Sequence, residues 1–119
     1  MLSLPPSVQI YVASEPADMR KSFNGLTILV NEALEKDPLS GHLFVFRNRR
    51  RTSLKLLCYD GQGFWLCQKR LSQGRFRFWP NSMEAAKDFQ AHELQVLLSA
   101  GDPAGTQAPP PWRRVNPQI

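Results

Sequence analysis

Four short apolar runs between residues 42 and 79, separated by turn-forming segments, constrain the fold of this chain more than any other feature. The runs are His42–Arg47, Ser53–Tyr59, Phe64–Leu71 and Arg75–Trp79, and the segments between them read N-R-R-R-T, D-G-Q-G and S-Q-G. A spacing of about ten residues with glycine-bearing turns is typical of a β-meander. Asp60-Gly61 is the strongest hairpin signal of the three turns. The sequence therefore predicts four consecutive antiparallel strands.

The residues before these runs predict a strand and then a helix. Val8–Ala13 alternates β-branched and aromatic residues, as a half-buried strand does. Apolar residues then recur at helical spacing from Met19 to Leu34, which predicts an amphipathic helix over that range. Ser14 and Asp18 both have the side-chain chemistry of an N-cap, and the sequence does not choose between them.

The residues after the meander predict a short helix and a tail. Pro80 ends the fourth predicted strand, and residues 81–90 fit either a helix or a short strand. Ala91–Ala100 predicts a helix, with Gly101 as its C′ residue. Residues 102–119 are rich in proline and predict a flexible tail.

Together these elements predict a single α+β domain over residues 1–101. It consists of an antiparallel β-meander of about four to five strands, an N-terminal amphipathic helix and a short C-terminal helix.

Nothing in the sequence predicts export or membrane insertion. The N-terminal M-L-S-L-P-P-S lacks the basic and apolar regions of a signal peptide. No apolar run approaches the roughly 20 residues that cross a bilayer. Cys58 and Cys67 lie on neighbouring apolar runs, where a free cysteine acts as a small hydrophobe. We therefore expect a soluble, cytoplasmic protein with free thiols and no membrane partner.

The positive charge of the chain is concentrated in one stretch. Nine of the 15 basic residues fall between Arg47 and Arg77, with Asp60 as the single acid, so this stretch has a net charge of +8. The remaining six basic residues and nine acids sum to −3, which gives +5 for the chain. Concentrated charge of one sign attracts polyanions, of which nucleic acid is the commonest. The predicted nucleic-acid-binding residues are Arg47, Arg49, Arg50, Arg51, Lys55, Lys69, Arg70, Arg75 and Arg77.

Strand alternation assigns the side chains of the meander to two faces. In R-F-R-F-W, Phe76 and Phe78 share one face, and the two arginines and Trp79 share the other. We predict one sheet face packed against the helices and a second that mixes basic and aromatic side chains. Trp65, Phe76 and Phe78 are predicted to belong to the core rather than to stack on bases.

Sequence signatures of catalysis are missing from the chain. His42 and His92 stand apart from any metal-ligand spacing, and no G-x-S-x-G motif occurs. Gly61 and Gly63 are turn residues without the G-K-S/T of a phosphate loop. We predict no catalytic residue, no metal, no cofactor and no small-molecule substrate. A carboxylate triad assembled from distant acids, as in a metal-dependent nuclease, is the enzymatic alternative.

Four segments of the chain resemble a bacterial protein family. In chain order they are P-A-D-M-R-K-S-F-N-G-L, D-P-L-S-G-H-L-F-V-F-R-N-R-R-R, K-L-L-C-Y-D-G-Q-G-F-W-L-C-Q-K-R-L and G-R-F-R-F-W-P, at residues 16–26, 37–51, 55–71 and 74–80. They resemble the small accessory protein of the insertion-sequence sixty-six transposon family, the TnpB-type product of its second reading frame. The resemblance covers about residues 8–101.

The resemblance implies a role in transposition beside a separate, larger transposase that cuts and joins DNA. Together with the basic stretch, it predicts a non-catalytic accessory protein that binds DNA at the ends of the element. The alternative is a protein-interaction adaptor that docks the transposase without touching DNA. DNA and the cognate transposase are thus the expected partners.

Overall fold

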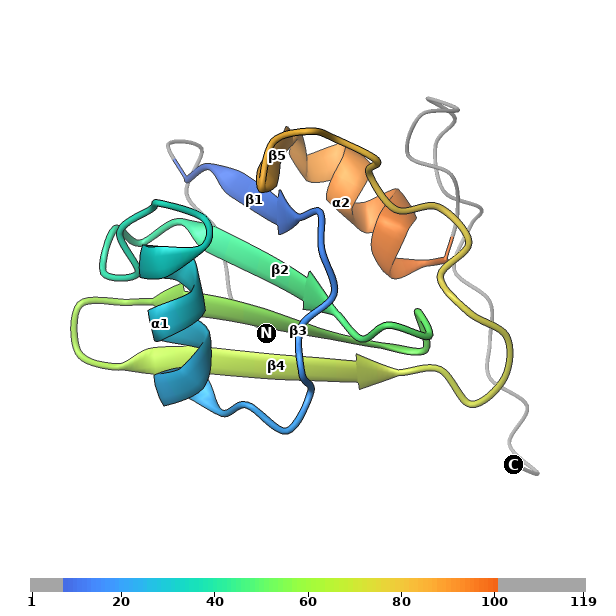
Figure 1. Cartoon of the computed structure of the whole chain (residues 1–119), viewed down its shortest axis with the longest axis horizontal. Helices are drawn as coiled ribbons and strands as arrows, with labels where there is room; N and C mark the ends of the chain where they lie inside the picture. The colour runs from blue at the N-terminus through green and yellow to red at the C-terminus, as the bar shows by residue number, and fades with distance from the viewer. Residues whose placement is uncertain (1–7, 101–119) are drawn as a thin grey trace.

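The computed structural model describes residues 8–100 and contains a five-stranded sheet with two helices (Figure 1). The strand order across the sheet is β4-β3-β2-β1-β5. The elements in chain order are β1 (Ile10–Ala13), α1 (Phe23–Glu32), β2 (Leu43–Arg47), β3 (Ser53–Tyr59), β4 (Phe64–Arg70), β5 (Ala86–Phe89) and α2 (Ala91–Leu98). This arrangement confirms the α+β class. The predicted tail, residues 102–119, lies outside the described residues.

The sheet is mixed, so the prediction of a purely antiparallel meander is wrong. β2, β3 and β4 form a meander, with pairs such as Phe44 opposite Leu57 and Leu57 opposite Leu66. β1, however, pairs with β2 in parallel. Parallel neighbours require a crossover connection, and the segment that contains α1 provides it. β5 then completes the sheet by pairing antiparallel to β1.

The fourth predicted strand is also wrong, because residues 75–79 form no strand. Phe76 and Trp79 are both buried, three positions apart, and strand alternation cannot place such a pair on one face. The fifth strand comes instead from Ala86–Phe89, in the region where the sequence left helix and strand open. Residues 71–85 therefore run outside the sheet from β4 to β5 (Figure 1).

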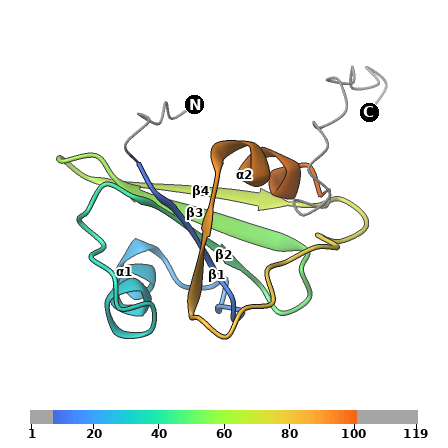
Figure 2. The same ribbon diagram turned by 90° about the horizontal axis from the view of Figure 1, so that it is seen from above.

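Helices lie on both faces of the sheet, whereas the sequence predicted one face against the helices and a second that mixes basic and aromatic side chains. Figure 2 shows α1 on one side of the sheet and α2 on the other. Leu26 and Val30 of α1 pack with Phe44, Phe46 and Leu57 on the first face. On the second face, the buried residues of α2 and of the 71–85 connector pack with those of β1, β2 and β3; they include Leu94, Leu97, Phe76, Trp79, Val12, Val45 and Leu56.

Helix α1 is shorter than predicted and begins later. The sequence predicted a helix from Met19 to Leu34, whereas α1 spans Phe23–Glu32. The strand predicted before it, at Val8–Ala13, is observed as β1 (Ile10–Ala13). Neither predicted cap residue acts as one. The Asp18 carboxylate accepts the backbone N–H and guanidinium of Arg20, and the Ser14 hydroxyl donates to the carbonyl oxygen of Glu84. Within residues 8–100, no helix is long and apolar enough to cross a membrane.

Helix α2 has a well-formed N-terminus and an unexpected C-terminus. Gln90 and Glu93 form a capping box, in which the Glu93 carboxylate accepts the Gln90 backbone N–H at 2.9 Å. At the other end, Ser99 is the C-cap residue, and Ala100 directly after it takes the left-handed conformation, with φ of 61°. The predicted C′ residue is therefore one position too late.

The β3–β4 turn is organised by Asp60, as its sequence predicts. One carboxylate oxygen accepts the backbone N–H groups of Gln62 and Gly63, both at 2.9 Å. The other accepts the indole N–H of Trp65 at 2.8 Å. Trp65 is 50% exposed, so its predicted place in the core is wrong. The carboxylate thus fixes an aromatic ring on the outside of the sheet.

These three hydrogen bonds lower the pKa of Asp60, the backbone contacts contributing most. A lowered folded-state pKa stabilises the turn above the pKa of the unfolded chain, and this stabilisation is lost as the pH falls through the folded value. We expect the Trp65 indole N–H resonance to shift with a midpoint below the usual aspartate range of about 3.5–4. An NMR titration measures it. Asp60→Asn should remove the transition, whereas an unchanged curve would contradict this assignment.

Candidate nucleic-acid interface

One end of the sheet collects three segments that carry arginine. They are the β2–β3 turn, the end of β4 and the start of the 71–85 connector, which lie together in both views (Figures 1 and 2). The Leu71 N–H donates to the carbonyl oxygen of Thr52 at 2.9 Å, and the Phe76 N–H donates to that of Arg51 at 2.7 Å. We call this region, residues 47–52 and 70–79, the basic end.

Seven of the nine predicted residues belong to the basic end. Five of them are exposed, and Arg47 and Arg51 are half-buried. Within residues 8–100 the only ion pair joins Arg20 to Asp18, so no carboxylate there neutralises the basic end by direct contact. The five exposed members are Arg49, Arg50, Arg70, Arg75 and Arg77.

Arg47 anchors the basic end rather than extending from it. Its guanidinium lies over the ring of Trp79, 5.6 Å from the ring centroid, and donates to the carbonyl oxygens of Ser14 and Asn48. Burial lowers the pKa of Arg47, and the nearby charges of Arg51 and Arg49 lower it further, against the opposing effect of Glu15. Like charges are therefore held close together here, and a bound anion would relieve their repulsion.

The β2–β3 turn is shaped by Asn48 and by a strained arginine. The Asn48 side-chain oxygen accepts the N–H groups of Thr52 and Ser53, and the Arg51 N–H donates to the Asn48 carbonyl oxygen. Arg51 has φ of 60°, a conformation that favours glycine. Its guanidinium donates to the carbonyl oxygen of Arg77 at 3.3 Å. Arg51 therefore links the turn to the connector, while Arg49 and Arg50 stay exposed at the tip.

Lys55 and Lys69 each donate to a backbone carbonyl oxygen near a helix, although Lys69 directly precedes Arg70 in β4. Lys55 is 7% exposed, and its ammonium donates to the carbonyl oxygen of Lys21 at 2.7 Å, just before α1. Lys69 donates to the carbonyl oxygen of Leu98 at the C-terminal end of α2, where a cation also complements the helix dipole. Because both ammonium groups form hydrogen bonds within the protein, these two lysines are less available to a partner than the exposed arginines.

The connector places Phe76 and Phe78 differently, although their sequence surroundings are alike. Phe76 is 0% exposed, as predicted, whereas Phe78 is 42% exposed, which contradicts its predicted place in the core. The cause is Trp79, whose indole N–H donates to the carbonyl oxygen of Ala13 at 2.7 Å. This long-range contact turns Trp79 inward and leaves Phe78 outward. The residues around Trp79 in the sequence do not indicate this hydrogen bond, because Ala13 is 66 positions away.

No group of three His, Cys, Asp or Glu side chains that could hold a metal ion occurs in the part of the chain from residue 8 to residue 100. Cys58 and Cys67 are both free thiols.

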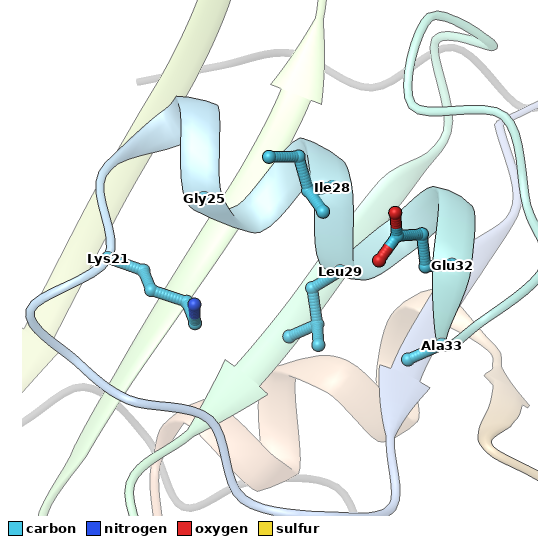
Figure 3. Close-up of a pocket in the computed structure, with 6 residues that line it drawn as sticks. All are labelled: Lys21, Gly25, Ile28, Leu29, Glu32 and Ala33. Atoms are coloured by element: carbon cyan, nitrogen blue, oxygen red, sulfur yellow. The ribbon is translucent and has the colours of Figure 1, made fainter.

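A second surface feature lies on α1, away from the basic end. It is a shallow depression of about 270 Å³ lined by Lys21, Gly25, Ile28, Leu29, Glu32 and Ala33 (Figure 3). Ile28, one of the lining residues, is 57% exposed. A Cβ at Gly25 would lie 3.0 Å from Lys21 Cγ, so the lysine side chain packs closely against this glycine. In Figure 1, α1 lies over the opposite end of the sheet from the β2–β3 turn.

The fold and the basic end together define a small mixed α+β domain with a cluster of arginines at one end of its sheet. Comparison with known protein families shows which family the chain belongs to. The chain belongs to the family described as IS66 Orf2 like protein, whose model matches residues 8–108. This is a transposition-associated family of accessory proteins.

Two relatives come from Sinorhizobium fredii (strain NBRC 101917 / NGR234). The uncharacterized protein y4hO is 41% identical over 102 residues, which cover 86% of this chain and 88% of that protein. The uncharacterized protein y4jC is 36% identical over 109 residues, which cover 92% of this chain and 85% of that protein. No solved structure matches the chain.

Proposed function

We propose that the chain is a non-catalytic accessory protein of transposition that binds DNA through the basic end. The single observation that carries the proposal is the gathering of seven arginines from three separate segments at one end of the sheet. Arginine forks take two phosphate oxygens at once, which suits a cluster that has no carboxylate partner in direct contact within residues 8–100.

A salt titration tests the proposal. If the five exposed arginines each neutralise one phosphate, log affinity falls with log salt at a slope near −4.5, about −0.9 per contact. Fluorescence anisotropy with DNA from the ends of the element, over a range of salt concentrations, measures this slope. Absence of binding at about 50 mM salt would overturn the proposal, because electrostatic binding is strongest there.

The depression on α1 supports a second candidate function, that of an adaptor for the transposase. An exposed Ile28 beside a hollow on a helix provides an apolar contact of the kind that protein interfaces use. This surface is separate from the basic end, so the two functions are compatible in one molecule.

The adaptor function predicts that Ile28→Gln lowers capture of the transposase about tenfold, as loss of a central apolar contact of roughly 1.4 kcal/mol does. Leu39→Gln is the matched control, since Leu39 is 56% exposed against 57% for Ile28. Co-purification after nuclease treatment measures capture. Equal capture by the two variants and the unaltered protein would contradict the adaptor function.

A further inference from the structure

The connector between β4 and β5 is fixed at two points within the basic end. At Phe76, the backbone N–H donates to the carbonyl oxygen of Arg51, and the ring is fully buried. At Trp79, the indole N–H donates to the carbonyl oxygen of Ala13, and the residue is 8% exposed. The yellow segment of Figure 1 therefore crosses the end of the sheet along a defined path.

Arg77 and Phe78 are held between these two points and face solvent. Phe78 is 42% exposed although both of its aromatic neighbours, Phe76 and Trp79, are buried. The carbonyl oxygen of Arg77 accepts a hydrogen bond from the Arg51 guanidinium, which adds a third restraint. An aromatic ring presented by a restrained segment loses little conformational freedom when it binds a partner.

The charge around Phe78 indicates what that partner is. Arg75 and Arg77 are exposed on the same short segment, and Arg51 contacts it from the β2–β3 turn. A partner that offers both phosphates and flat aromatic faces matches this combination. Duplex DNA presents phosphates but stacks its base faces inside the helix, whereas single-stranded DNA exposes both.

We propose that Phe78 is a stacking contact for an unpaired nucleobase, so that the basic end prefers DNA with unpaired bases to an intact duplex. The proposal rests on the DNA-binding function proposed above and adds its substrate class. In it, the arginines hold the phosphates of the strand and the Phe78 ring stacks on one base beside them.

The test compares three labelled DNAs of one sequence by anisotropy: a single strand, a duplex, and a duplex with a mismatched bubble. Phe78→Ala is expected to lower affinity for the single strand and the bubble about tenfold, because one base loses its stacking partner. Affinity for the duplex should change less than about twofold. Phe78→Trp should retain the preference, since indole also stacks on bases.

Leu39→Ala is the matched control, because Leu39 is an exposed apolar residue outside the basic end. It should change none of the three affinities. Equal effects of Phe78→Ala on single strand and duplex, or no effect on either, would overturn this inference while leaving DNA binding by the arginines intact. If none of the three DNAs binds at low salt, the proposed function itself fails.

Discussion

Replacing Arg49 and Arg50 together with alanine is expected to lower DNA affinity about 60-fold at roughly 0.1 M salt. Each phosphate contact makes affinity vary with salt to a power near 0.9, so two lost contacts make the slope about 1.8 shallower. Extrapolating that difference from about 1 M, where the electrostatic contribution vanishes, gives the expected loss. Both side chains are exposed at the tip of the β2–β3 turn and make no hydrogen bond in the described structure.

The matched control removes two charges from the other side of the molecule. Lys21 and Lys36 flank α1, before and after it, and Lys21→Ala with Lys36→Ala lowers the net charge by the same amount. This control should keep nearly the full salt slope. If the two double variants lose affinity equally, DNA senses only the net charge, and the basic end is not a site. Anisotropy titrations over several salt concentrations distinguish the two outcomes.

The arginines at the turn tip could be predicted from sequence because their position depends on local chemistry alone. N-R-R-R-T between two apolar runs forms a hairpin turn, and a turn exposes its residues whatever the rest of the fold does. Asp60-Gly61 is predictable for the same reason, and its carboxylate caps the turn in the structure. Strand alternation likewise predicts that Lys55 and Leu57 share a face.

The burial of Lys55, the parallel strand pair and the exposure of Phe78 depend on contacts between distant segments. The periodicity of apolar residues does not predict such contacts. Alternation predicts which face of the sheet Lys55 is on, but not the hydrogen bond that its buried ammonium makes to the carbonyl oxygen of Lys21, 34 positions earlier. The parallel pairing of β1 with β2 depends on where the crossover returns the chain. The outward position of Phe78 depends on a hydrogen bond between Trp79 and Ala13, 66 positions apart.

The basic end and the depression on α1 are two separate surfaces of the molecule. Of the nine predicted basic residues, two donate to carbonyl oxygens just before α1 and at the end of α2, and the other seven belong to the basic end. The depression on α1 lies away from those seven. Variants at Arg49 and Arg50 and at Ile28 can therefore affect DNA binding and transposase capture independently.

Phe76→Ala is expected to lower the free energy of unfolding by about 3–5 kcal/mol, the usual cost of removing a fully buried phenyl ring. Phe76 is 0% exposed and packs in the core between the sheet, α2 and the connector. A domain of this size has a total stability of roughly 5–15 kcal/mol, so the variant should unfold at much lower temperature. Urea denaturation followed by circular dichroism measures the loss.

Phe78→Ala is the control that the chain itself offers for Phe76→Ala. The two phenylalanines stand two positions apart in R-F-R-F-W, yet Phe78 is 42% exposed. Its replacement should change the free energy of unfolding by no more than about 0.5 kcal/mol. Equal losses for the two variants would mean that the connector follows a strand-like alternation. Phe78 would then be a core residue, and the stacking contact proposed for it could not exist.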